Sequence, residues 1–175
     1  MIKYMNSPTE IDIERTLVLL KPDAVQRGLV GRIIQRFEDV GLKIVATKMI
    51  WPTKELAEKH YADLGERRGQ DVKDKMVSML TDLGPIMALV LEGIEAVSEV
   101  RMLVGPTEPK SALPGTIRGD FSHVSYKYAD AKGIGVKNLI HASSSQEDAL
   151  KEIALWFKDD EIYSYRSVHD AHILE

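Results

Sequence analysis

The sequence predicts an α/β domain of the α+β type, in which a four-stranded antiparallel sheet carries its helices on one face. Four short runs are apolar and rich in β-favouring residues, which is typical of buried strands. The segments between them place apolar residues at helical spacing. The 175 residues are 44% hydrophobic, which is enough for one core and favours a single domain over residues 1–175, with residues 1–13 as an N-terminal extension.

The first strand is expected in RTLVLLKPD, residues 15–23, where Pro22 stops a short apolar run. The segment VGRIIQRFEDVGL follows as a helix, because its apolar residues recur at helical spacing and Gly41 is suited to the C-terminal cap. Those apolar residues are Ile33, Ile34, Phe37 and Val40.

The second strand is expected in LKIVATKMIW, residues 42–51. Thr53 is suited to the N-cap of a helix that continues through Tyr61. The next segment, ERRGQDVKDKMVSMLTDLG, is charged and mixed, and we expect it to form a further helix that ends near Gly84.

The third strand is the nearly uniformly apolar segment 85–93, and residues 94–105 form the helix after it. The fourth strand is NLIHAS, residues 138–143. In the final helix, Ser145 with Asp148 three residues later resembles a capping box. This order of elements contains the split β-α-β arrangement of a ferredoxin-like sandwich.

A proline- and glycine-rich segment interrupts the pattern between the helix over residues 94–105 and the fourth strand. PTEPKSALPGTIRGD, residues 106–120, holds three of the seven prolines and two of the twelve glycines, so we expect a long ordered or functional loop. Its RGD tripeptide would suggest cell adhesion in a secreted chain, but the N-terminus MIKYMNSPTEIDIE has no apolar core of signal-peptide length.

Composition argues against several kinds of partner. The net charge of -4 creates no global field that attracts nucleic acid or anionic lipid. The expected strands carry almost none of the aromatic residues of a ferredoxin-like RNA binder. There are no cysteines, so disulfides and zinc thiolates are excluded. No apolar run approaches the ~20 residues of a membrane span. We therefore expect a cytoplasmic protein without nucleic-acid or membrane partners.

Histidine is the first candidate for catalysis. His141 stands at the end of an apolar strand between small residues. Neutral imidazole is a good nucleophile, and about three quarters of imidazoles with the unperturbed reference pKa are neutral at pH 7. Glu152, on the following helix, could fix the tautomer of the ring, and Ser143 could bridge the two. A lone buried histidine satisfied by a backbone carbonyl is the structural alternative. His60 precedes a tyrosine on a polar helix and is predicted to be a surface residue.

The remaining histidines are weaker candidates. The HDAH pair, His169 and His172, has a spacing that would allow a metal site, but the sequence offers no third ligand beside it.

Cations that could hold a phosphate are spread along the chain. Lys21 follows the first strand, where ligands bind at the ends of strands in open sheets. Arg101 lies on the helix over residues 94–105 with Thr107 just beyond it, and Arg118 lies in PGTIRGD. Lysine and arginine are the side chains that clamp phosphate. No G-x-x-x-x-G-K-[ST] motif occurs, so phosphate chemistry here needs a route other than a P-loop.

Five motifs together resemble the nucleoside diphosphate kinase family, in order and across about residues 14–175. They are KPDAVQRGLVG, HYADL, PGTIRGDF, NLIHAS and LWF. The resemblance implies a ferredoxin-like sandwich and a ping-pong transfer of the γ-phosphoryl group from a nucleoside triphosphate, mainly ATP, to a nucleoside diphosphate. It also implies Mg²⁺ bound mainly through the nucleotide phosphates, and a homo-hexamer, with a tetramer as the alternative.

The resemblance assigns a role to each matching residue. His141 falls on the phosphorylated nucleophile, and Ser143 and Glu152 on the residues that support it. The residues that match contacts to the nucleotide phosphates and ribose are Lys21, Tyr61, Arg101, Thr107, Arg118 and Asn138.

Three features depart from the family pattern. Ser144 replaces an aspartate, the segment before Met76 lacks the phenylalanine that usually stacks on the base, and residues 122–137 form a longer segment similar to that of some archaeal members. We expect an aliphatic base contact from Val72, Met76 and Val136. A catalytically silent nucleotide-binding or regulatory relative is the alternative function, although such relatives typically lose the histidine that this chain keeps.

Overall fold

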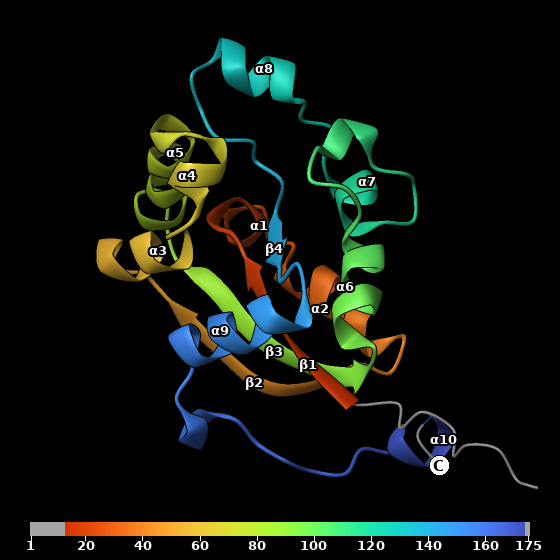
Figure 1. The fold of residues 1–175 in the computed structure, drawn as a ribbon. Helices are drawn as coiled ribbons and strands as arrows, with labels where there is room; N and C mark the ends of the chain where they lie inside the picture. Colours follow the sequence, from red (N-terminus) through yellow and green to blue (C-terminus); the bar gives the residue numbers. More distant parts are fainter. Residues whose placement is uncertain (1–12, 174–175) are drawn as a thin grey trace, which may run out of the picture.

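The computed structural model describes residues 13–173 and contains the expected four-stranded antiparallel sheet. The strands lie in the order β2-β3-β1-β4 (Figure 1). They are β1 (Ile13–Leu20), β2 (Lys43–Ile50), β3 (Ile86–Ile94) and β4 (Ile140–Ala142). The N-terminal extension expected over residues 1–13 lies outside the described residues, apart from Ile13, which begins β1.

Ten α-helices and two short 3-10 helices connect and cover these strands in the described part of the chain. None of these helices is both long and apolar enough to cross a membrane. The α-helices are α1 (Pro22–Gln26), α2 (Val30–Glu38), α3 (Lys54–His60), α4 (Leu64–Arg68), α5 (Gln70–Thr81), α6 (Ala96–Val104), α7 (Ile117–Phe121), α8 (Tyr126–Ala131), α9 (Gln146–Trp156) and α10 (Asp170–Ile173). The 3-10 helices are η1 (Pro109–Ser111) and η2 (Asp159–Glu161).

Helices cover both faces of the sheet, so the expectation of helices on one face was wrong (Figure 1). Because side chains alternate along a strand, Leu17 and Leu19 of β1 pack with α3, α5 and α9 on one face. Val18 and Leu20 pack with α1, α2 and α6 on the other. The uniformly apolar run of β1 is typical of a strand buried on both faces.

Local signals placed two helix starts correctly, whereas the first long helix, α2, has its C-cap at Asp39 rather than at the expected Gly41. The side chain of Thr53 accepts a hydrogen bond from the backbone of Leu56 at 3.2 Å, and that of Ser145 from Asp148 at 3.1 Å, so both predicted N-caps are confirmed. The helix expected to end near Gly84 is instead two helices, α4 and α5, because Gly69 between them has a positive φ of 94°.

The segments around the fourth strand hold more structure than a loop. The proline-rich segment contains η1 and ends in α7, which carries Arg118, and the longer segment 122–137 contains α8. The fourth strand itself is only three residues long, because the chain turns sharply at Leu139, where φ is +71°. Asn138 therefore lies outside the ladder and faces the site.

Candidate active site

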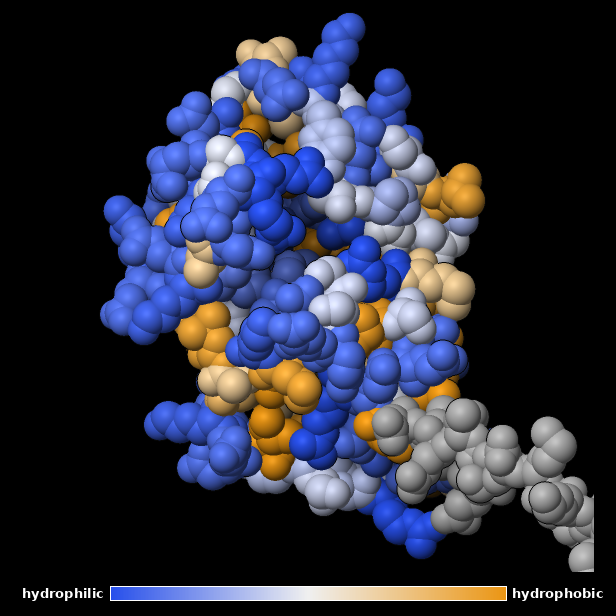
Figure 2. Space-filling view, viewed as in Figure 1, coloured by the Kyte–Doolittle hydropathy of each residue, from blue (hydrophilic) through white to orange (hydrophobic). Residues whose placement is uncertain are grey.

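Seven of the nine predicted site residues line one cavity of about 740 Å³. Its walls come from α4, α5, α6, α7, α8 and β4, with Lys21 before α1 and Tyr61 after α3. In Figure 2 this face of the molecule is hollowed near its centre, and hydrophilic side chains surround the hollow. The seven residues are Lys21, Tyr61, Arg101, Thr107, Arg118, Asn138 and His141. A smaller cavity near α10, of about 350 Å³, is lined by Lys43, whose ammonium group is paired with Glu92 and Asp170.

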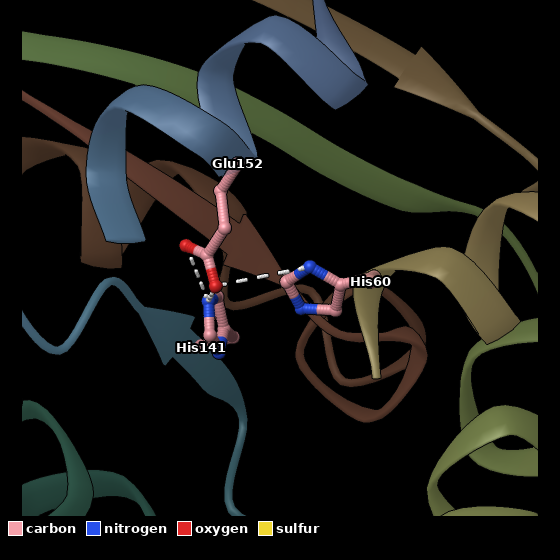
Figure 3. Close-up of side chains that lie close together, drawn as sticks. All are labelled: His60, His141 and Glu152. Carbon is pink, nitrogen blue, oxygen red and sulfur yellow. Dashed lines mark hydrogen bonds and ion pairs between the residues drawn. The ribbon is translucent and has the colours of Figure 1, made fainter. Parts of the chain in front are cut away.

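His141 and Glu152 contact each other directly. Nε2 of His141 lies 3.0 Å from both carboxylate oxygens of Glu152, which projects from α9 (Figure 3). A carboxylate can only accept a hydrogen bond, so Nε2 carries the proton and donates it. The Nδ1 atom of a neutral His141 is then left with its lone pair free, which is the form a nucleophile needs.

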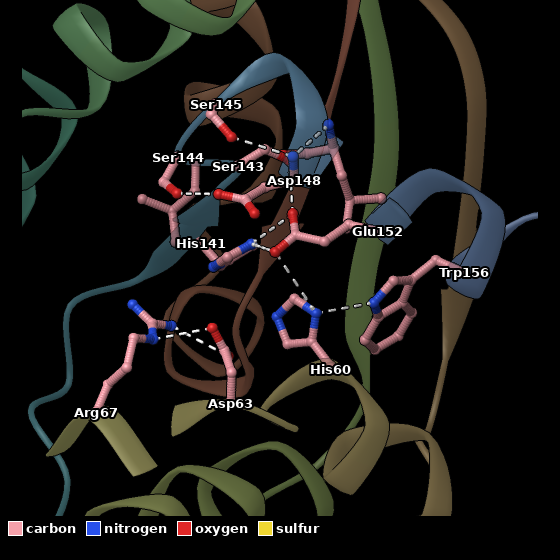
Figure 4. Close-up of polar contacts among 12 residues, drawn as sticks. His60, Asp63, Arg67, His141, Ser143, Ser144, Ser145, Asp148, Glu152 and Trp156 are labelled. Atoms are coloured by element: carbon pink, nitrogen blue, oxygen red, sulfur yellow. Dashed lines mark hydrogen bonds and ion pairs between the residues drawn. The ribbon is translucent and has the colours of Figure 1, made fainter. Parts of the chain in front are cut away.

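Ser143 supports Glu152 rather than bridging it to His141. The Ser143 hydroxyl donates to Oε2 of Glu152 at 2.6 Å and accepts a hydrogen bond from the backbone N–H of Leu17 at 3.3 Å (Figure 4). Ser143 is fully buried. It therefore fixes the carboxylate to β1, which in turn fixes the histidine ring.

Ser144, the residue that departs from the family pattern, lies one step away from this network. Its hydroxyl donates to the Asp148 carboxylate on the first turn of α9 (Figure 4). Asp148 thus bonds Ser144 instead of closing the reciprocal half of a capping box. Ser144 has no hydrogen bond to His141 or Glu152 among those found in the described residues.

His60 is not a surface residue, so that prediction was wrong. Its side chain is 0% exposed, and its ring meets the ring of His141 edge to face, with centroids 4.5 Å apart and an angle of 83° (Figure 4). The indole N–H of Trp156 donates to Nδ1 of His60 at 3.2 Å, so the His60 proton is on Nε2. Burial, and then the neighbouring His141 and Lys21, hold the pKa of His60 well below its ordinary value. The neutral ring of His60 therefore packs directly against His141.

The signal that could have revealed His60 was weak. The polar composition of α3 hides the fact that its last turn points inward, toward a tryptophan 96 residues later in the chain. The next residue, Tyr61, lines the cavity as predicted. Burial, and then Glu152, raises the pKa of Tyr61 above its ordinary value, so its phenol stays protonated and can donate a hydrogen bond.

Lys21 is almost fully buried at the floor of the cavity, directly after β1. Its ammonium group donates to Oδ1 of Asn138 at 2.8 Å, and the Asn138 amide donates to the carbonyl of Thr107 at 2.9 Å. Burial lowers the pKa of Lys21 to about 8, against the raising effect of Asp23, while Arg118 lowers it further. The group is thus a cation at pH 7 that loses its proton more readily than an ordinary lysine.

Arg118 binds three backbone carbonyls from two segments of the chain. Its Nε donates to the carbonyl of Asn138 at 3.2 Å, Nη1 to Gly105 at 2.8 Å, and Nη2 to Ile140 at 2.6 Å. Burial lowers its pKa to about 10, so it stays charged at neutral pH. A guanidinium has five N–H groups, and each Nη keeps one for a ligand.

The end of the cavity formed by α4, α5, α8 and the segment after α8 mixes charged and apolar side chains. The three residues expected to contact a base, Val72, Met76 and Val136, all line it. The other side chains at this end were not predicted from the sequence, and they come mainly from α4, α5 and α8. They include Arg67, Arg68, Lys75, Tyr126, Asp130 and Ile134.

Potential metal ligands are few in this site. Within residues 13–173, one group of three or more such residues occurs, and it consists of His60, His141 and Glu152. The hydrogen bonds described above already engage one ring nitrogen of each histidine. His169 and His172 are both exposed and belong to no such group in the described chain.

Known proteins resemble the chain over nearly its whole length. The family model for nucleoside diphosphate kinase matches residues 14–162. A nucleoside diphosphate kinase from Pyrococcus abyssi is 50% identical over 161 residues, which cover 92% of this chain and 94% of that protein. One from Borreliella burgdorferi is 47% identical over 156 residues, covering 88% and 93%.

Two solved structures of this kind share the fold of the chain. A transition-state mimic of nucleoside-diphosphate kinase from Borrelia burgdorferi, with bound vanadate and ADP, has a TM-score of 0.90 at 44% identity and covers 93% of this chain and 97% of that one. A halophilic nucleoside diphosphate kinase from Halobacterium salinarum in complex with CDP has a TM-score of 0.79 at 40% identity, covering 94% and 100%.

Proposed function

The chain belongs to the nucleoside diphosphate kinase family, and we propose that it transfers the γ-phosphoryl group of a nucleoside triphosphate to a nucleoside diphosphate through His141. It is a phosphotransferase that acts between nucleotides. The contact of Nε2 of His141 with Glu152 carries the proposal for the nucleophile, because it leaves Nδ1 as the free lone pair.

In the first half-reaction Nδ1 of His141 forms a bond to the γ-phosphorus, and the bond from that phosphorus to the bridging oxygen breaks. The nucleoside diphosphate leaves with the electron pair. The ring then bears positive charge, which the Glu152 carboxylate stabilises through Nε2–H. A second nucleoside diphosphate reverses these steps and takes the phosphoryl group.

The cations of the cavity supply the charge stabilisation that phosphoryl transfer needs. Its transition state is loose, so positioning and electrostatics dominate catalysis. We assign Arg118 to the transferring group, Arg101 and Thr107 to the diphosphate, and Lys21, Asn138 and Tyr61 to the phosphates and ribose. The B. burgdorferi structure holds ADP and vanadate, and we propose that this cavity takes the equivalent ligands.

A divalent metal ion would enter with the nucleotide, and we propose Mg²⁺. The cavity presents the cations Lys21, Arg101 and Arg118, and the Glu152 carboxylate beside His141 is already bonded to His141 and Ser143. Mg²⁺ also prefers phosphate oxygens and water to a protein cage. Bound in this way, it would neutralise charge on the phosphates. Loss of activity on chelation, with recovery on adding Mg²⁺, tests the assignment.

Broad base specificity is expected, and one assay tests both this and the reaction. The aliphatic side chains of Val72, Met76 and Val136 offer burial without reading hydrogen-bonding edges, whereas an aromatic stack is worth about 1–3 kcal/mol per base. Each of ATP, GTP, CTP and UTP should phosphorylate a diphosphate with a different base, with kcat/KM values of similar size.

The outcomes of this assay are distinct. A preference of about a hundredfold, or roughly 2.7 kcal/mol, for one base would indicate a specific contact and contradict the aliphatic assignment. No exchange with any donor would instead favour the silent nucleotide-binding relative.

The rate should fall as pH rises through about 8, because Lys21 loses its proton there. This fall is expected in the pH profile of kcat/KM, which reports the ionisation of the free enzyme. Bound phosphate would raise the pKa of Lys21, so kcat should fall only at higher pH. In the unfolded chain lysine keeps its proton up to about pH 10.4. Between about pH 8 and 10.4 the unfolded chain therefore binds more protons than the folded protein, and the titration of Lys21 raises the free energy of unfolding. Activity should therefore drop without loss of fold.

Lys21→Arg is the matched control, because arginine stays charged over this range. The variant should lose part of its rate through poorer fit but show no limb near pH 8. A limb that persists in Lys21→Arg would assign the titration to another group.

We further propose that the chain forms a homo-hexamer, with a tetramer as the alternative. The segment 106–120 carries Arg118, and contacts between subunits would help to hold so long a segment still. Light scattering would measure the mass relative to the 19.6 kDa chain, and an active monomer would contradict the proposal. Nucleic acid and membranes are not expected partners, and the expected cytoplasmic location can be checked by cell fractionation.

A further inference from the structure

A strained turn lies directly before the proposed nucleophile. Leu139 is fully buried and has φ of +71°, and the N–H of Ile140 donates to the carbonyl of Asn138 across it at 2.8 Å. This is a γ-turn with a positive φ, which is rare and costs energy in a residue other than glycine. Such a conformation persists only where the surroundings hold it.

Three groups hold this turn. Oδ2 of Asp23 accepts the N–H of Leu139 at 3.0 Å, and the N–H of Lys21 donates to the Leu139 carbonyl at 2.8 Å. Arg118 donates to the carbonyls of Asn138 and Ile140 on either side. Of these groups, Asp23 alone has no role in the reaction described above.

Asp23 is an unusual residue to bury at this position. It is 8% exposed, and its Oδ1 has no hydrogen-bond partner within the described chain. A buried carboxylate is costly unless other charges compensate for it. Lys21 and Arg118 lie close enough to interact with its charge.

The turn has a functional residue at each end. Asn138 precedes Leu139 and bonds the ammonium of Lys21. His141 follows two residues later and pairs with Leu19 in the sheet. A different backbone path at Leu139 would displace both side chains. We propose that Asp23 is a positioning residue for phosphoryl transfer, which holds the strained turn at Leu139 and thereby places Asn138 and His141; this rests on the function proposed above.

The first test compares two substitutions of Asp23 with the intact protein. The rate of phosphohistidine formation is measured at saturating ATP and Mg²⁺, with ADP affinity and thermal unfolding measured alongside. Asp23→Ala should slow the reaction about 10²-fold, as expected for misplaced reacting groups. Asp23→Asn, whose amide oxygen can take the same bond from Leu139, should keep most of the rate. If Asn is as slow as Ala, the charge rather than the anchored turn matters, and the proposal fails.

A second test isolates the backbone strain. Asp23→Ala is repeated in two backgrounds, Leu139→Ala and Leu139→Gly, which both remove the leucine side chain but differ in their tolerance of positive φ. The loss of rate on removing Asp23 should be clearly larger in the alanine background. Equal losses in both folded backgrounds would overturn the proposal. If the intact protein forms no phosphohistidine, the proposed function fails instead, so the two failures are distinguishable.

Discussion

His141→Ala is expected to abolish the phosphoenzyme, because no other side chain in the cavity combines a free nucleophilic nitrogen with a fixed tautomer. Incubation of the intact protein with γ-labelled ATP and Mg²⁺ should give a phosphoprotein that is labile in acid and stable in base, and a nucleoside diphosphate should discharge it. The variant should carry no such label and should have no measurable transfer above background.

The experiment must distinguish His141 from the neighbouring His60. The ring of His60 lies edge to face on that of His141, but its Nδ1 accepts the Trp156 N–H and its Nε2 carries the proton, so it has no free lone pair. It should not substitute for the nucleophile. His123→Ala removes an exposed histidine and is the matched control, with full labelling expected. Acid-labile label on His141→Ala would overturn the assignment.

Arg118→Ala should lower turnover by about 10²–10³, the usual loss on removing one preorganised donor to a developing charge. The structure adds a second reason for a large effect. The same guanidinium holds the carbonyls of Gly105, Asn138 and Ile140, and leaving buried carbonyls without a donor is costly. The variant should therefore also unfold at a lower temperature.

Arg118→Lys separates the two contributions. Lysine keeps the positive charge but cannot span three carbonyls in the way a planar fork does. If the clamp matters, its turnover and melting temperature should lie nearer those of the alanine variant than those of the intact protein. Normal turnover with only a raised KM in Arg118→Ala would move the residue to ground-state binding.

Much of this molecule could be predicted from the sequence, because the relevant signals are local. The four strands follow from short apolar runs, and the helix starts at Thr53 and Ser145 follow from side chains that bond backbone three residues away. The resemblance to the family, carried by motifs in register along the chain, also assigned seven residues that line one cavity.

The tertiary structure alone decided how these parts support one another. The burial of His60 depends on Trp156, 96 residues later, and the turn at Leu139 depends on Asp23, 116 residues earlier. Nothing within a few residues of either position signals such a partner. The sequence by itself thus determined most of the elements and the candidate site residues, because the signals for them are local. Three features depend instead on distant segments that meet only on folding. They are the burial of the His60 ring, the covering of both sheet faces and the carboxylate that holds the turn at Leu139.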